Sequence, residues 1–203
     1  MKRRGILFII SAPSGSGKTT LCNRLVESIE GLYRSISMTT RPPRTGERDG
    51  MDYIFIEKQE FLKRQKRKEF LEWANVFGEY YGTPKKYISH MLNKGSDVLL
   101  SIDVQGAMKI KRLHMEACYI FILPPSMKML KERLMNRSTD TSKAIRERLR
   151  IAKKELSYCH KYDYVLINNR IESALDGLRA IITAERHRIW RNRDVIHAFG
   201  KNI

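Results

Sequence analysis

Cysteine is scarce in this sequence, and the spacing of the few that occur excludes several kinds of site. Among 203 residues there are three cysteines, Cys22, Cys118 and Cys159, with no Cys-x-x-Cys pair. The five histidines are equally dispersed, so no Cys/His spacing suits a zinc ion. We therefore expect reduced, mostly buried thiols, and we assign no histidine to a metal or to catalysis.

Long apolar runs are also missing. No run approaches the roughly 20 residues that a helix needs to cross a bilayer, so we expect no membrane partner. The apolar residues 5–10 follow the basic start Lys2-Arg3-Arg4, but this stretch is too short for a signal peptide and leads straight into a glycine-rich loop. We interpret it as a strand and expect the protein to stay in the cytoplasm.

Acidic residues are few relative to basic ones. The sequence has 39 lysines and arginines against 22 aspartates and glutamates, a formal net charge of +17. This excess predicts attraction to anions, which could be nucleic acid, an acidic membrane surface or phosphorylated small molecules. The densest basic cluster, residues 63–68, is expected to be a solvated helix face. Because no aromatic stacking motif or helix-turn-helix pattern occurs, nucleic acid is not the favoured partner.

Strands and helices are expected to alternate along most of the chain. Buried strands are predicted at residues 5–11, 97–102, 118–123 and 164–167. Helices are predicted at residues 17–28, 84–93, 105–114, 126–136, 142–159 and 173–190, with Ser126 as an N-cap. This order indicates an α/β protein with a mostly parallel sheet that helices cover on both faces.

Residues 35–84 interrupt this alternation. They begin with a polar, basic segment that contains Pro42-Pro43, and continue with a short strand at 53–56 and a short helix at 58–68. The aromatic stretch 70–82 is expected to be strand-like or irregular. A chain of 203 residues suits one domain with a sizeable core, so we expect these residues to form a small lobe inserted into it.

The strongest motif is a glycine-rich loop between the first strand and the first helix. It matches the Walker A pattern except at its first position, and it reads Ala12-Pro13-Ser14-Gly15-Ser16-Gly17-Lys18-Thr19-Thr20. Gly15 and Gly17 let successive N–H groups turn toward a phosphate, and the following helix adds its positive end. Lys18 suits the β- and γ-phosphates, and the Thr19 hydroxyl suits Mg²⁺. The sequence therefore predicts a site for a nucleoside triphosphate with Mg²⁺.

Six segments, specific in their order and spacing, resemble the guanylate kinase family along nearly the whole chain. They are residues 11–19 (SAPSGSGKT), 39–47 (TTRPPRTGE), 70–74 (FLEWA), 80–83 (YYGT), 102–106 (IDVQG) and 122–126 (ILPPS). The resemblance implies a P-loop NTPase-type parallel sheet flanked by helices, with a small α+β GMP-binding lobe and a mobile lid. It implies one domain over residues 1–203, with the core at 1–34, 85–136 and 149–203, the lobe at 35–84 and the lid at 137–148.

The same resemblance implies an enzyme that transfers phosphate from ATP to GMP, and it assigns the GMP site. Glu72 and Asp103 would bind the donor edge of guanine, and Ser37 and Thr83 would lie near O6, as carboxylates and hydroxyls suit these atoms. The GMP phosphate would be bound by the arginines and tyrosines at positions Arg41, Arg44, Tyr53 and Tyr81. Taken singly, each of these four could be an ordinary surface or core residue.

Catalysis would need no general base, because the attacking phosphate oxygen of GMP is already anionic. By resemblance, the catalytic cations are Lys18, Arg41, Arg137 and Arg148. ATP would contact the phosphate loop together with Arg133, Arg137 and Asn168. Arg133 and Arg137 are four residues apart and could instead form a salt-bridged helix surface. Ser101 stands where the family usually carries an aspartate, which concerns how the water shell of the metal is held.

Other functions remain open at this point. A kinase for another nucleoside monophosphate or a sugar phosphate would keep the phosphate loop, but Glu72, Asp103 and Thr83 suit guanine. A protein-binding module of the same shape is disfavoured by the intact Gly17-Lys18-Thr19. The partners expected are ATP and GMP, with dGMP undecided, in a monomer or a homodimer. The basic residues 186–201 receive no functional interpretation.

Overall fold

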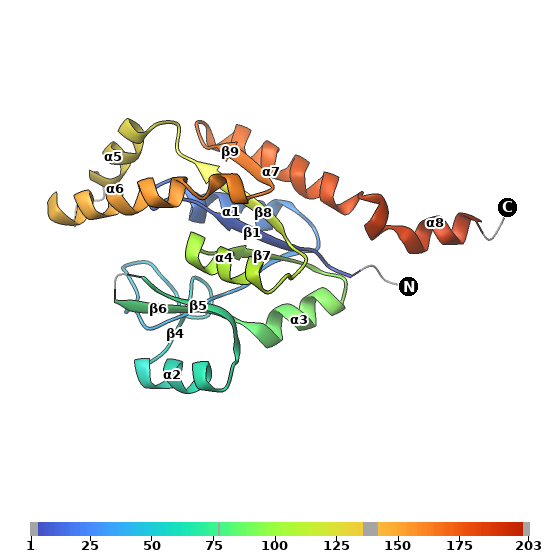
Figure 1. Ribbon diagram of the computed structural model, residues 1–203, viewed down its shortest axis with the longest axis horizontal. Coiled ribbons are helices and arrows are strands. Elements are labelled where there is room, and N and C mark those ends of the chain that lie inside the picture. Colours follow the sequence, from blue (N-terminus) through green and yellow to red (C-terminus); the bar gives the residue numbers. More distant parts are fainter. Residues whose placement is uncertain (1–3, 77, 136–141, 201–203) are drawn as a thin grey trace.

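The computed structural model describes residues 4–76, 78–135 and 142–200 and contains two sheets, one above the other in Figure 1. The larger sheet has five parallel strands in the order β2-β7-β1-β8-β9. Its strands are β1 Leu7–Ser11, β2 Leu32–Arg34, β7 Asp97–Ser101, β8 Cys118–Leu123 and β9 Tyr164–Ile167. Strands of one direction joined through helices confirm the predicted α/β class.

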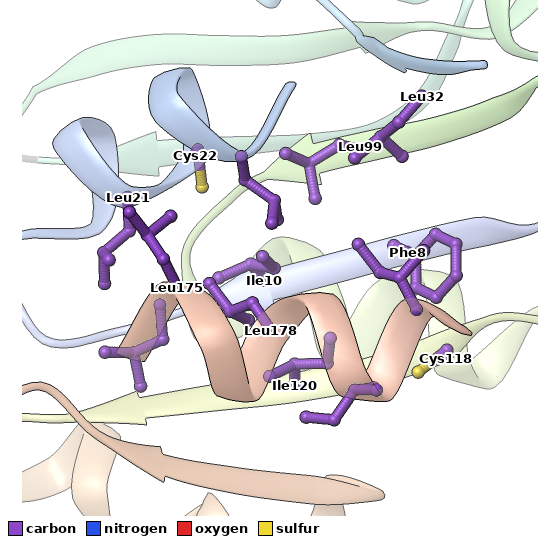
Figure 2. Packing of buried hydrophobic residues seen from close by; sticks show 14 of the residues in the cluster. Phe8, Ile10, Leu21, Cys22, Leu32, Leu99, Cys118, Ile120, Leu175 and Leu178 are labelled. Carbon is purple, nitrogen blue, oxygen red and sulfur yellow. The ribbon is translucent and has the colours of Figure 1, made fainter. Parts of the chain in front are cut away.

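Helices cover both faces of this sheet because the strands are apolar on both sides. The helices of the core are α1 Lys18–Ser28, α3 Lys85–Asn93, α4 Val104–Arg112, α5 Met127–Met135, α6 Ser142–Leu156 and α7 Ile171–Arg186. On one face, Phe8 and Ile10 pack against α1 and α7, as Figure 2 shows. On the other face, Leu7 and Ile9 pack against α3 and α4. A continuous apolar run is typical of a strand that is buried on both faces.

The smaller sheet lies in the inserted lobe and has the strand order β4-β3-β6-β5. Its elements are β3 Met38–Thr39, β4 Ile54–Phe55, α2 Lys58–Lys66, β5 Phe70–Val76 and β6 Glu79–Pro84. Helix α2 is anchored by Phe61, whose ring is stacked on Phe70 with 4.5 Å between centroids. Gly82 permits this packing, because a Cβ there would lie 2.7 Å from the Phe70 ring.

Helices α5 and α6 form a separate layer above the phosphate loop. Leu130 and Leu134 of α5 pack with Ala152 of α6 in a small cluster of their own. A Cβ on Gly15 would lie 3.2 Å from the side chains of both leucines, so α5 sits directly on the loop. The Ser126 hydroxyl accepts from the Met129 N–H at 3.1 Å, which confirms the predicted N-cap.

The structure differs from the sequence expectations in a few elements. Strand β2 was not predicted, and its three residues are too few to give a periodic pattern. The helix expected to reach residue 159 ends at Leu156, and a 3-10 turn, η1 Cys159–Lys161, follows it. Beyond α7, a second turn, η2 Ile189–Arg191, leads to α8 Arg193–Gly200, which extends away from the body of the molecule in Figure 1.

Within the described ranges, no helix is both long enough and apolar enough to cross a bilayer. Cys22 and Cys118 are buried free thiols and Cys159 is a partly buried one, as expected.

Candidate active site

The phosphate loop joins β1 to α1 at the carboxyl edge of the parallel sheet. Gly15 and Gly17 have φ values of 89° and 84°, a region that favours glycine. The Ser16 N–H donates to the Pro13 carbonyl at 3.1 Å and closes the turn. No side chain caps the N-terminus of α1, so its first N–H groups can bind an anion. Loop and helix together form a phosphate-binding cradle.

Asn168 supports this loop from the end of β9. Its amide nitrogen donates to the Ser16 carbonyl at 2.8 Å, and the residue is only 3% exposed. A Cβ on Gly17 would lie 2.6 Å from the same nitrogen, so glycine is required there for a second reason. Asn168 therefore lies behind the loop and does not line the cavity in front of it. Its predicted approach to adenine stays a prediction.

A cavity of about 460 Å³ opens in front of the loop and collects most of the predicted site residues. Four parts of the chain line it: the phosphate loop with the start of α1, the inserted lobe, the segment from the end of β7 to the start of α4, and α6. The predicted residues that line it are Ala12, Pro13, Ser14, Gly15, Gly17, Lys18, Thr19, Thr20, Ser37, Arg44, Tyr53, Glu72, Tyr81, Asp103 and Arg148. One space thus joins the predicted sites for both nucleotides.

Other predicted residues lie around this cavity. Arg41 lines an adjoining recess of about 330 Å³ together with Arg44, Tyr81 and Arg148. Ser16 and Thr83 are fully buried behind the cavity wall. Arg133 is half-buried on α5 and is not among the lining residues. Arg137, like residues 138–141 of the expected lid, lies outside the described residues.

Lys18 extends from the first turn of α1 toward the end of β7. Its ammonium donates to the Ile102 carbonyl at 2.7 Å. Burial lowers the pKa of Lys18, while the charges of Cys22, Asp103 and Glu155 act in the opposite direction. An ammonium group has three donors, so this contact leaves donors for phosphate oxygens.

Glu72 on β5 is a buried carboxylate, 6% exposed, at the inner end of the lobe. It accepts a hydrogen bond from the Thr83 hydroxyl on β6. Burial raises the pKa of Glu72 to about 7, and the charge of Asp103 adds to the effect. Helix α4 approaches so closely that a Cβ on Gly106 would lie 2.6 Å from Glu72 Oε2. The arrangement places an acceptor and a hydroxyl side by side, as recognition of a base edge requires.

Asp103 stands at the N-terminus of α4, directly after β7. Its Oδ1 accepts from the Gly106 N–H at 2.8 Å, so the side chain caps the helix. The residue lines the cavity together with Glu72. Asp103 is therefore held in a fixed orientation with part of its carboxylate available to a ligand.

Arg41 is the most constrained of the predicted phosphate-binding residues. Its guanidinium forms two hydrogen bonds of 2.9 Å with the Glu47 carboxylate and a third, of 3.2 Å, with the Tyr81 hydroxyl. It also lies 5.3 Å from the centre of the Tyr53 ring. Glu47 was not predicted as a site residue. It holds Arg41 in position and offsets part of its charge.

Sequence reasoning missed several residues that line the cavity. They are Ala74, Asn75, Val76, Ile102, Gln105, Ile151 and Glu155. Ser101, noted in the sequence as a departure from the family pattern, also lines the cavity. Ile102 and Gln105 fall within a segment that carried the family resemblance. Glu155 gave no such signal, because it follows Lys153-Lys154 in a basic helix and looks like an ordinary surface charge.

A magnesium ion fits this site as a companion of a nucleotide. Among residues 4–76, 78–135 and 142–200, no group of three or more histidines, cysteines, aspartates or glutamates is placed to hold a metal. Mg²⁺ in nucleotide sites commonly keeps water and phosphate oxygens and takes only one or two protein ligands. The Thr19 hydroxyl, next to Lys18 and lining the cavity, is suited to that role.

A parallel sheet whose central strand runs through a glycine-rich loop into a helix defines a P-loop nucleotide-binding protein. The inserted lobe, with its buried acceptor facing the same cavity, narrows the class to kinases of small phosphorylated acceptors. The guanylate kinase family model matches residues 4–185 of this chain. The chain belongs to the guanylate kinase family.

Individual relatives agree over most of the chain. Guanylate kinase from Caldanaerobacter subterraneus subsp. tengcongensis is 47% identical over 195 residues, which cover 96% of this chain and 95% of the relative. Guanylate kinase from Thermotoga maritima is 41% identical over 200 residues, covering 98% and 97%. The crystal structure of guanylate kinase from Anaplasma phagocytophilum is similar with a TM-score of 0.79 at 37% identity, covering 94% of this chain and 90% of that one.

Proposed function

We propose that this protein transfers the γ-phosphoryl group of ATP to GMP and releases ADP and GDP. Membership of the guanylate kinase family supports the reaction. The observation that carries the acceptor is Glu72, a buried acceptor in the wall of the cavity that Lys18 also lines, with the Thr83 hydroxyl donating to it from behind that wall. Guanine has two hydrogen-bond donors on one edge, with the acceptor O6 beside them. Glu72, Thr83 and Asp103 complement these groups.

ATP binding belongs to the phosphate loop. The N–H groups of the loop and of the first turn of α1 bind the β- and γ-phosphates, and Lys18 adds a cation. Mg²⁺, when bound through Thr19 and the phosphates, neutralises part of the negative charge. Asn168 keeps the loop in its bound shape through Ser16.

GMP binding belongs to the inserted lobe, residues 35–84, which we propose as the acceptor domain. Arg44, Tyr53 and Tyr81 line the same cavity as Glu72, and Arg41 lines the recess that adjoins it. These groups bind the phosphate of GMP and hold one of its oxygens toward the γ-phosphate of ATP. Ser37, which directly precedes β3, complements O6 beside Thr83.

The transfer step depends on alignment and charge neutralisation. The attacking oxygen of GMP is anionic near neutral pH, so no side chain has to remove a proton. Arg148 on α6 lines the cavity opposite the lobe, and we assign it, with Arg133 and Arg137, to the transferring phosphate. Closure of residues 137–148 over the cavity would exclude water and limit hydrolysis of ATP. We expect this reaction to take place in the cytoplasm.

Product identification tests the proposal. Purified protein with ATP, Mg²⁺ and GMP should yield ADP and GDP in equal amounts, measured by ion-exchange chromatography. Lys18→Ala should remove both products and leave the unfolding temperature unchanged within a few degrees. A matched control is Lys94→Ala, which removes an exposed lysine at the end of α3. ADP without GDP would show hydrolysis in place of transfer and overturn the assignment of GMP.

A further inference from the structure

Helix α6 presents one continuous face to the active-site cavity. Arg148, Ile151 and Glu155 all line it, and their spacing of three and four residues places them along one side of a helix. Arg148 stands at the end that also lines the adjoining recess between α6 and the lobe. Glu155 stands two turns further on, in the last turn before Leu156. The two charges of this face are therefore opposite in sign and separated along the helix.

Glu155 is an unusual acid for this helix. The other acid on α6 with a described side chain, Glu147, pairs with Arg150 at the surface, at 2.6 Å. Glu155 is partly buried, and its carboxylate forms no hydrogen bond or ion pair with the residues that the structure describes. Burial raises its pKa to about 7, with the charge of Asp103 acting in the same direction and Lys18 against it. A partly buried carboxylate without a bonded partner lowers the stability of the fold unless it interacts with another group of the site.

Lys18 is a cation that lines the same cavity as Glu155, from the side of the phosphate loop. Its partly buried ammonium is bonded to the Ile102 carbonyl and keeps two donors for other partners. Glu155 and Asp103 are the carboxylates that act on the charge of Lys18 from inside the cavity. Asp103 is fixed by its own helix cap, so its orientation cannot follow α6. Glu155 stands on α6 itself.

We propose that Glu155 is a positioning residue that orients the Lys18 ammonium toward the phosphates of ATP and couples this orientation to the placement of α6. A helix that brings Arg148 to the transferring phosphate brings Glu155 to Lys18 in the same movement. Glu155 then holds the lysine from α6, so that the phosphate loop and α6 are positioned together. This role rests on the proposed phosphoryl transfer and adds a residue to it.

Steady-state kinetics give the first test. At pH 8, Glu155→Gln should lower kcat about tenfold, which is the effect of losing one charge-assisted interaction. It should change KM for GMP less than twofold. Glu155→Asp, which keeps the charge, should recover part of the lost kcat. The matched control is Glu27→Gln, which makes the same charge change on the exposed side of α1 and should leave kcat unchanged. An unchanged kcat in Glu155→Gln, or equal losses in the glutamine and aspartate variants, would overturn the proposal.

A double-mutant cycle on binding separates positioning from a structural role. Calorimetry with Mg-ADP is carried out on the unaltered protein, Glu155→Gln, Lys18→Ala and the double variant. Glu155→Gln should weaken ADP binding when Lys18 is present and should not weaken it when Lys18 is alanine. Equal weakening in both backgrounds would mean that Glu155 does not act through Lys18. Because this cycle uses ADP alone, it gives an answer even if GMP proves not to be the acceptor.

Stability provides the remaining control. A neutral glutamine relieves the burial of a carboxylate, so Glu155→Gln should unfold at the same temperature as the unaltered protein or a higher one at pH 8. A lower unfolding temperature, together with a lower kcat and a higher KM for GMP, would identify Glu155 as a structural residue and overturn the proposal.

Discussion

Replacement of Glu72 by glutamine should raise the stability of the free protein while it removes binding of GMP. Glutamine has nearly the same shape and keeps an oxygen that can accept from the Thr83 hydroxyl. The substitution therefore changes the charge in a site that is only 6% exposed, and little else. The change in the free energy of unfolding therefore measures how much the buried Glu72 carboxylate destabilises the folded protein.

The size of the effect follows from the pKa. Burial raises the pKa of Glu72 from 4.5 to about 7, and each tenfold change in proton affinity corresponds to about 1.4 kcal/mol. The folded protein binds this proton more tightly than the unfolded chain does. The stability linked to Glu72 is thus full below pH 4.5 and is lost as the pH rises through about 7. Ionised Glu72 then costs up to about 3 kcal/mol at pH 8, as an upper bound.

Urea unfolding at pH 5.5 and pH 8 is the assay. Glu72→Gln should be more stable than the unaltered protein by about 1 to 3 kcal/mol at pH 8, and the gain should shrink at pH 5.5. Glu27→Gln, exposed on α1, serves as the control and should show no difference between the two pH values. A gain of the same size at both pH values, or a loss at pH 8, would show that the buried charge of Glu72 does not destabilise the fold.

Three further predictions concern binding. Affinity for GMP, measured by calorimetry, should fall as the pH drops from 8 to 5.5, because protonation of Glu72 near pH 7 removes the acceptor that guanine needs; an affinity independent of pH would contradict this. Asn168→Ala should weaken Mg-ATP binding about tenfold by releasing Ser16, with GMP binding unchanged; a parallel loss for both nucleotides would point to a general loss of structure. Glu47→Gln should raise KM for GMP several-fold, because Arg41 loses the carboxylate that holds it in place; an unchanged KM would show that Arg41 does not depend on this pair.

The sequence predicted the core well because its signals are local. The strand β1, the glycine loop and helix α1 follow one another without a gap, and each part constrains the next. The strands β7, β8 and β9 are short apolar runs between turn signals and were found for the same reason. Strand β2 has three residues and acquires its identity only by pairing with β7, so no local pattern could reveal it.

Site residues could be predicted where they belong to a sequence motif. They could not be predicted where only the packing of the folded chain brings them to the cavity. The residues that line the cavity from the phosphate loop came from motifs, as did several from the lobe, whereas Ala74, Asn75 and Val76 of the lobe were not predicted. The partner of Arg41 is six positions away, at Glu47, inside a segment that the resemblance covered without assigning the acid a role. Asn168 depends on its contact with Ser16, more than a hundred residues away along the chain, and Glu155 lines the same cavity as Lys18 from an equally distant segment. Only the folded arrangement brings such residues together.

Phosphorylation of GMP by ATP is tested most directly by measuring ADP production from ATP and Mg²⁺ with GMP, AMP, CMP, UMP and dTMP offered separately. We expect turnover with GMP and none above background with the other four. Equal or faster turnover with another monophosphate would contradict the roles of Glu72, Thr83 and Asp103, and no turnover with any of the five would contradict the reaction itself.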